Sequence, residues 1–228
     1  MKNFFSKLTR FWNEDRSLTA MLLLLLLFIF VFAPTINPDG NGQVLLKIIY
    51  SVIVVSGILS VLQNNRYVII ISIFAVIDLL VYWLSDVKSS TTLLIVNDLS
   101  SVLFNFFFAI AILIKTFKPG DITFQRIEGS IVVYLLMGLV FAFVFHTIYL
   151  FAGESAYNNI SGADMKTFLY YSFTTLTTVG YGDISPVHPL ARSFANLEAL
   201  IGQLYPAILI ARLVSMEFES SNRRKNNS

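Results

Sequence analysis

The ten residues TTLTTVGYGD, Thr174–Asp183, are polar, rich in threonine and contain two glycines. They lie between two long apolar runs in a chain of 228 residues, of which 56% are hydrophobic. The segment Met165–Leu176 is semi-apolar and too short to cross a bilayer, which is typical of a re-entrant segment. Non-helical backbone persists at membrane depth only where protein buries it or where it lines an aqueous cavity. We therefore expect this stretch to re-enter the membrane and to line a path.

Long apolar runs dominate the rest of the chain. The mean hydropathy is +0.71 and 13% of the residues are charged, whereas about a quarter are charged in a soluble domain. Six runs approach the ~20 residues that span a bilayer as a helix: Leu18–Ala33, Val44–Leu62, Val68–Leu84, Leu93–Ile114, Ser130–Phe151 and Leu190–Val214. No cleavage pattern of small residues follows the first run, so we interpret it as a spanning helix and not as a signal peptide. The sequence predicts an all-α integral membrane protein with six transmembrane helices, a re-entrant pore helix and a loop.

The distribution of Lys and Arg predicts the orientation of the chain. If the N-terminus is cytoplasmic, twelve of the sixteen basic residues fall in cytoplasmic segments. Cytoplasmic loops carry an excess of Lys and Arg in multi-pass proteins. We therefore expect a multi-pass protein of the plasma or inner cell membrane with both termini in the cytoplasm.

The six residues Thr178–Asp183, TVGYGD, resemble the selectivity-filter signature of potassium channels. The setting agrees, because a short amphipathic segment precedes the signature and a spanning run lies on either side. The alternative is a chance Thr- and Gly-rich loop in an outer connection. The resemblance implies a filter over Thr178–Gly182 in which Thr178, Val179, Gly180 and Tyr181 bind K+.

The residue types of the signature suit this chemistry. Successive carbonyl groups of an extended strand point in alternating directions. Aiming them all at one axis requires left-handed dihedrals at alternate positions, which Gly180 and Gly182 adopt without steric cost. Thr178 adds a hydroxyl oxygen at the inner end. Val179 and Tyr181 are expected to turn their side chains outward into the supporting protein.

Neighbouring residues are expected to support the filter. Asp164 is a suitable N-cap for a pore helix over 164–177, whose C-terminal end directs its negative dipole toward the pore centre. The predicted supporting residues are Thr177, Asp183, Tyr170, Tyr171 and Glu198. The two tyrosines are interpreted as packing behind the filter, and interfacial anchoring is the alternative. Glu198 is expected to brace the pore helix through a Thr or Tyr.

The last apolar run is interpreted as the inner helix of the pore. The resemblance places a gating-hinge glycine at Gly202, and Pro206 removes a helical hydrogen bond one turn later. Counted in helical steps, Gln203, Pro206, Ile210 and Val214 share the predicted pore-facing stripe. The alternative for Gly202 is that it permits close helix packing.

A single loop cannot surround an ion, so several copies must meet around an axis. The resemblance implies a homotetramer with a central pore and no cofactor other than the K+ ions in the filter. It places Ser185, two residues after Asp183, at the outer mouth. The expected partners are further copies of the chain, membrane lipid and K+, and no nucleic acid.

The first four runs resemble the sensor of voltage-gated potassium channels with one difference. The fourth run, Leu93–Ile114, contains no Arg or Lys, whereas voltage sensing requires charge that moves through the field. The resemblance is therefore closest to bacterial six-helix potassium channels without a charged sensor, and the predicted channel is not voltage-gated. Asp78 is interpreted as paired with hydroxyl groups, Asp98 as reaching the headgroups, and His146 as structural or solvated.

These features predict five parts of the chain: a cytoplasmic segment (1–17), a sensor-like domain without gating arginines (18–115), a linker (116–129), a pore domain (130–216) and a short cytoplasmic tail (217–228). No nucleophile–base pair, metal cluster or phosphate loop is evident, and the chain has no cysteine, so we do not expect an enzyme. The predicted function is passive K+ conduction. The alternatives are a non-conducting or regulatory membrane subunit and an ion-transporter subunit with a filter-like loop.

Overall fold

The computed structural model describes residues 14–37, 40–61, 67–85, 90–117, 123–160, 162 and 164–226. Most of the predicted N-terminal segment 1–17 lies outside these residues, as do the central part of the predicted linker and the last two residues of the tail. The elements are α2 (Glu14–Leu27), η1 (Phe28–Phe32), α3 (Ala33–Thr35), α4 (Asn41–Val61), α5 (Tyr67–Leu84), α6 (Thr91–Thr116), α7 (Phe124–Ala152), η2 (Glu154–Ala156), β1 (Tyr157–Asn158), α8 (Met165–Leu176), β2 (Ser185–Pro186) and α9 (Pro189–Asn226).

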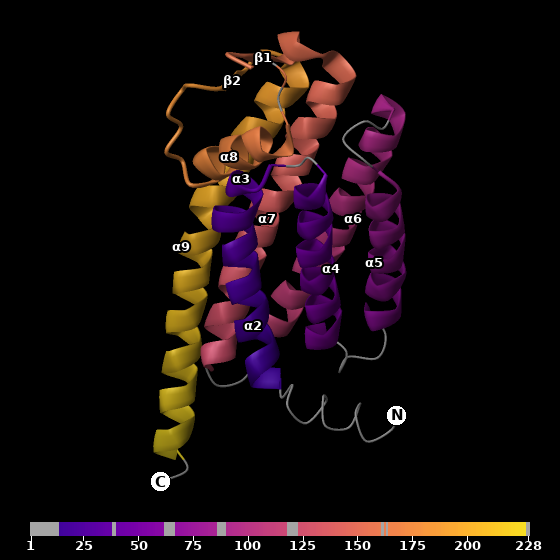
Figure 1. Cartoon of the computed structure of the whole chain (residues 1–228). Coiled ribbons are helices and arrows are strands. Elements are labelled where there is room, and N and C mark those ends of the chain that lie inside the picture. The colour runs from indigo at the N-terminus through magenta and orange to yellow at the C-terminus, as the bar shows by residue number, and fades with distance from the viewer. Residues whose placement is uncertain are drawn as a thin grey trace, which may run out of the picture.

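The described residues of all six apolar runs are helical, which confirms the predicted helical membrane fold. Five helical stretches are long and apolar enough to cross a membrane, and α5 supplies a shorter apolar stretch over Ile69–Leu84. The number of crossings therefore stays a prediction. In Figure 1, α8 and the two short strands lie toward one end of the molecule, and α4, α5 and α6 stand on the side away from α9.

Two boundaries differ from the sequence expectation. Helix α7 begins at Phe124 and α6 continues to Thr116, so the connection between them is shorter than the predicted linker 116–129. Helix α9 continues to Asn226, well beyond the apolar run that ends at Val214. Helices extend past an apolar run where flanking polar residues still favour helical dihedrals, and the hydrophobic pattern alone does not mark these ends.

The first helix changes geometry before Pro34. Residues Phe28–Phe32 form a π-helical turn, in which the amide of Ala33 donates to the carbonyl of Phe28. Proline has no amide hydrogen and its ring crowds the preceding turn. The wider turn accommodates Pro34 at the start of α3, and the chain leaves the helix at Ile36 in an extended conformation.

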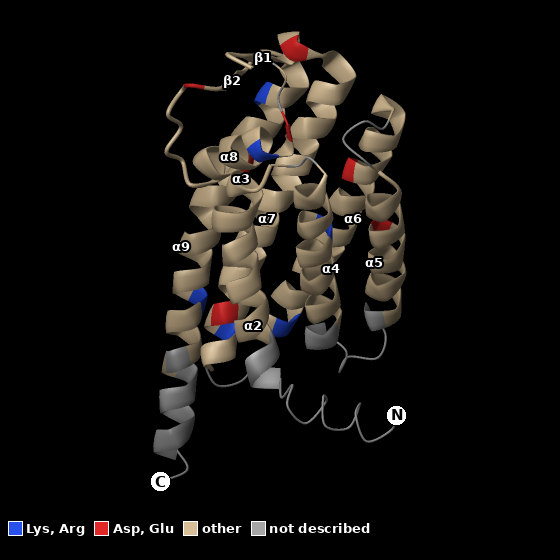
Figure 2. Ribbon diagram, viewed as in Figure 1, with Lys and Arg blue, Asp and Glu red and all other residues tan. Residues whose placement is uncertain are grey.

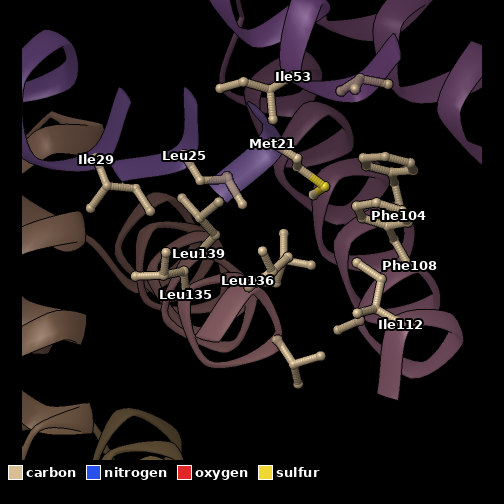
Figure 3. Packing of buried hydrophobic residues seen from close by; sticks show 14 of the residues in the cluster. Met21, Leu25, Ile29, Ile53, Phe104, Phe108, Ile112, Leu135, Leu136 and Leu139 are labelled. Carbon is tan, nitrogen blue, oxygen red and sulfur yellow. The ribbon is translucent and has the colours of Figure 1, made fainter. Parts of the chain in front are cut away.

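The core that positions the pore domain lies between α2, α6 and α7 (Figure 3). Met21 and Leu25 of α2 are completely buried, and Leu136 of α7 has an exposed fraction of 1%. Phe104 and Phe108 of α6 stack with ring centroids 5.6 Å apart. The charged residues mostly lie toward the ends of the helices (Figure 2), as expected where the middle of each helix meets lipid or other helices.

Candidate ion-conduction site

The pore helix begins at an N-cap that the sequence predicts. Asp164 Oδ1 accepts hydrogen bonds from the amide of Thr167 at 3.3 Å and from its hydroxyl at 3.1 Å. Helix α8 then runs for 12 residues and inserts Phe168 and Leu176, both fully buried, into the pore domain. Its C-terminal carbonyls face the start of the filter, where their partial negative charge favours a cation.

The filter backbone leaves the pore helix in an alternating conformation. Thr178, Gly180 and Gly182 have φ of 60°, 52° and 79°, and all three lie in the left-handed region. The amides of Val179 and Gly180 both donate to the carbonyl of Thr174, at 3.0 and 3.1 Å. Left-handed residues at every second position aim successive carbonyl groups toward one side. Thr178 is notable because a β-branched residue pays a steric cost in this region.

The filter is uncovered within a single chain. All residues from Thr177 to Asp183 are exposed, and Val179 and Tyr181 are 52% and 73% exposed. In Figure 1 this segment runs between α8 and β2 on the side of the molecule away from α5. A large apolar side chain and an aromatic side chain therefore lie uncovered beside each other in a single chain.

Asp183, at the outer end of the filter, is held by two side chains. The hydroxyl of Tyr170 donates to Oδ2 of Asp183 at 2.6 Å, and the Tyr170 ring stacks on Tyr181 with centroids 6.5 Å apart. The side-chain amide of Asn159 donates to the backbone carbonyl of Asp183 at 3.0 Å. The hydrogen bond to Asp183 raises the pKa of Tyr170 to about 12. Sequence analysis missed Asn159, because it lies in the outer connection, far from the signature.

A short antiparallel pair of strands joins the segment after Asp183 to the connection that precedes the pore helix. Tyr157 pairs with Pro186 and Asn158 with Ser185, and the side-chain amide of Asn158 donates to Ser185 Oγ at 3.3 Å. The predicted mouth residue Ser185 is therefore half-buried and anchored to the connection that precedes the pore helix.

The rear of the pore helix rests on α7 and α9. Ser172 Oγ lies 2.5 Å from Oε1 of Glu198 and 2.7 Å from the carbonyl oxygen of Gly138. Glu198 thus contacts the pore helix as expected, but through a serine rather than a Thr or Tyr. Tyr171 is buried and packs edge-on against Phe145 of α7, with centroids 4.8 Å apart.

The predicted inner-pore residues follow one helix. Gln203, Ile210 and Val214 are exposed in a single chain, and Pro206 is half-buried. Gly202 is buried, and a Cβ atom added there would overlap the carbonyl oxygen of Leu176. The structure thus shows the close packing that was the alternative for Gly202, and the hinge stays a prediction.

Helices α5 and α6 each contain a buried acid. Asp78 of α5 accepts hydrogen bonds from the hydroxyls of Ser101 at 2.7 Å, Tyr50 at 2.9 Å and Ser100 at 3.3 Å. The expectation that Asp98 reaches the headgroups is wrong, because its exposed fraction is 2%. Its Oδ2 lies 2.7 Å from Nδ1 of His146, so burial is compensated by a histidine from α7 that the linear sequence does not connect to it. Among the described residues, no group of three His, Cys, Asp or Glu is arranged to hold a metal ion.

The long apolar helices indicate a multi-pass membrane protein. An ion-channel family model, described as "Ion channel", matches residues 130–219, from α7 through α9. Relatives include two-pore potassium channel 5 of Arabidopsis thaliana, 31% identical over 44% of this chain and 24% of that protein. LctB of Bacillus caldotenax is 34% identical over 36% of this chain and 64% of that protein.

A further relative is the inward rectifier potassium channel Kirbac3.1 of Paramagnetospirillum magnetotacticum, 36% identical over 33% of this chain and 24% of that protein. The chain thus spans less than two-thirds of the length of these three relatives. No solved structure matches the chain. Residues 130–219 thus match an ion-channel domain, and two of these three relatives are named potassium channels, which agrees with the resemblance seen in the sequence.

Proposed function

We propose that the chain forms a K+-selective channel that conducts passively through a central pore. The observation that carries the proposal is the alternation of left-handed residues at Thr178, Gly180 and Gly182. This backbone supplies carbonyl oxygens in place of the hydration shell of the ion, with Thr178 contributing a hydroxyl oxygen at the inner end. Thr178, Val179, Gly180 and Tyr181 are the proposed K+ ligands.

Four copies are proposed to surround the pore. A single filter leaves Val179 and Tyr181 exposed, and one strand of carbonyls cannot replace a full hydration shell. Only 11% of the apolar window of α9 is buried in one chain, against 61% for α7. Closed cyclic symmetry places α9 and the filter of each copy at a common axis. Gln203, Pro206, Ile210 and Val214 then line the inner cavity.

The residues around the filter are proposed to hold its shape. Asp183 and Tyr170 do so at the outer end, Thr177 at the inner end, and Tyr171 and Glu198 behind the pore helix. The channel is proposed to be independent of voltage, because the polar side chains buried along α6 are uncharged apart from Asp98, which is paired with His146 and lies on a helix without Arg. Both termini are proposed to lie in the cytoplasm.

The test is a flux assay on the purified full chain in liposomes loaded with K+. In liposomes that contain the wild type, we expect the channel to release the K+ before any ionophore is added. A K+ ionophore should then cause little further release. Liposomes that retain K+ until the ionophore is added would contradict the proposal. This result would favour the alternative of a non-conducting membrane subunit.

A further inference from the structure

Glu198 of α9 has no opposite charge beside its carboxyl group among the residues that the structure describes. Its exposed fraction is 0% within a single chain, so a neighbouring copy cannot reach it. Neither ion pair found in the described part of the chain includes it. In the described part of the chain, the titratable groups within electrostatic reach are three phenols: Tyr134 of α7, Tyr157 of β1 and Tyr171 of α8. A buried carboxylate without a partner is strongly disfavoured.

The hydrogen-bond geometry requires a proton on this carboxyl group. Ser172 Oγ contacts two acceptors, the carbonyl oxygen of Gly138 at 2.7 Å and Oε1 of Glu198 at 2.5 Å. A serine hydroxyl carries one hydrogen and a carbonyl carries none. Two of these three oxygens would therefore face each other without a hydrogen if Glu198 were ionised. One proton on Glu198 completes the series, with Glu198 donating to Ser172 and Ser172 donating to Gly138.

The surroundings of the second carboxyl oxygen, Oε2, also favour a protonated Glu198. Oε2 of Glu198 is buried and has no hydrogen-bond partner among the described residues. Leaving a charged oxygen unpaired costs more than leaving a neutral one unpaired. A neutral carboxylic acid tolerates the unpaired Oε2 as an ordinary carbonyl oxygen, whereas a carboxylate does not.

The chain of hydrogen bonds joins three helices of the pore domain. Gly138 lies in α7, Ser172 in the pore helix α8 and Glu198 in α9. One turn further along α8, the carbonyl of Leu176 accepts a hydrogen bond from Tyr134 at 3.2 Å. The pore helix is thus fixed to the outer and inner helices at its rear, directly before the filter.

We propose that Glu198 is a positioning residue that acts as a neutral acid: it donates its proton to Ser172 and so holds the pore helix between α7 and α9. Loss of the proton reverses the contact, because a carboxylate competes with the Gly138 carbonyl for the single hydrogen of Ser172. The hydrogen bond from Ser172 of α8 to the Gly138 carbonyl of α7 is then broken. The consequence for conduction rests on the proposed channel function, and the protonation state does not.

The protonation state is measured by infrared difference spectroscopy on the purified full chain. A protonated carboxyl group has a C=O stretching band separate from the bands of carboxylates. We expect Glu198→Gln to remove one such band at neutral pH. We expect Ser172→Ala to keep the band but shift it, because the hydrogen bond is lost. Loss of carboxylate bands in Glu198→Gln, or an unshifted band in Ser172→Ala, would overturn the assignment whether or not the protein conducts.

The functional consequence is measured as a pH profile of K+ flux. The amide of Gln can donate to Ser172 but cannot ionise, so Glu198→Gln should match the wild type at neutral pH. At alkaline pH we expect the wild-type flux to change on the order of tenfold, the factor that corresponds to about one hydrogen bond, and the variant to keep its neutral-pH flux. The matched control is Glu128→Gln, a buried glutamate of α7 that accepts from Thr19 and should retain the wild-type profile. An alkaline change that persists in Glu198→Gln would overturn this consequence.

Discussion

Gly202 of the inner helix lies directly against the backbone carbonyl of Leu176, at the C-terminal end of the pore helix. The contact joins the middle of α9 to the last turn of α8, directly before the predicted filter. The partner is a backbone atom, so it cannot move aside by changing a side-chain rotamer. The glycine is therefore required for the packing of α9 on α8, whether or not the helix also bends there.

Gly202→Ala is expected to destabilise the pore domain. The added Cβ must push the pore helix away from α9, and overpacking of this kind costs typically 1–3 kcal/mol or more. A thermal unfolding curve of the purified protein should show a clear loss of stability. The control is Ala207→Gly, an exposed position of the same helix, which changes helix propensity by about 1 kcal/mol without touching the pore helix. Equal stability of Gly202→Ala and the wild type would contradict the packing described for Gly202.

Gly180→Ala is expected to weaken ion selectivity. A Cβ at this position meets no atom within 4 Å, so its effect comes from φ of +52° alone. Left-handed dihedrals cost about 1–2 kcal/mol for a residue with a Cβ, in each of four filters. The permeability ratio of K+ to Na+ should fall by about tenfold or more. The matched control is Gly162→Ala, where φ is +57° and the space is equally open, but which lies outside the filter. An unchanged ratio in Gly180→Ala would exclude the proposed filter.

Open probability is expected to be nearly independent of voltage. Each charge that crosses the field is worth about 2.3 kcal/mol per 100 mV, and α6 carries no cation before Lys115. Single-channel recordings across a wide voltage range in planar bilayers should therefore reveal less than about one gating charge per channel. A steep dependence, equivalent to several charges, would show that another segment senses voltage.

Ser185→Tyr is expected to strengthen external block by tetraethylammonium. Four aromatic rings at the mouth attract a quaternary ammonium ion by about 0.5–2 kcal/mol per favourable contact, whereas serine offers no π face. An external dose–response curve should shift to lower concentration, with the K+ preference unchanged. Ser155→Tyr, at an exposed position of η2, is the control and should leave the block weak. Tight block of the wild type, or no gain with Ser185→Tyr, would show that residue 185 does not line the mouth.

Tyr170→Phe is expected to remove an alkaline transition in stability. The phenol donates to Asp183 only while it is protonated, and its pKa is raised to about 12. A raised pKa contributes stability that is complete below the ordinary value of about 10 and is lost as the pH rises through the folded value. The wild type should therefore lose stability between about pH 10 and pH 12 relative to Tyr170→Phe. The control is Tyr149→Phe, because the Tyr149 hydroxyl makes no hydrogen bond among the described residues. This variant should lose stability over the same pH range as the wild type does.

The sequence predicted the helical fold and the position of the filter, because both depend on local patterns. Apolar runs of bilayer length mark helices without any knowledge of their neighbours. The TVGYGD motif requires residues in the left-handed region, and the glycines at positions 180 and 182 predict this conformation because glycine adopts it without steric cost. Thr178 was not expected in that conformation, since a threonine gives no local sign of positive φ.

The contacts that the sequence did not reveal join residues far apart along the chain. Asp98 and His146 are 48 positions apart. In the sequence each is an isolated polar residue in an apolar run, so nothing local indicates that they pair. Ser172 was missed as the partner of Glu198, because one serine in a pore helix is indistinguishable from a solvated one. The extension of α9 to Asn226 has no apolar pattern to mark it. Such features depend on tertiary packing, which periodicity does not encode.

The central claim is that the filter selects K+, and the reversal potential under bi-ionic conditions tests it most directly. Purified wild-type protein is fused into a planar bilayer with K+ on one side and Na+ on the other. The account predicts a current whose reversal potential lies far from zero in the direction set by K+, and a loss of this shift in Gly180→Ala. A wild-type current that reverses near zero, with Na+ carried as readily as K+, would contradict it.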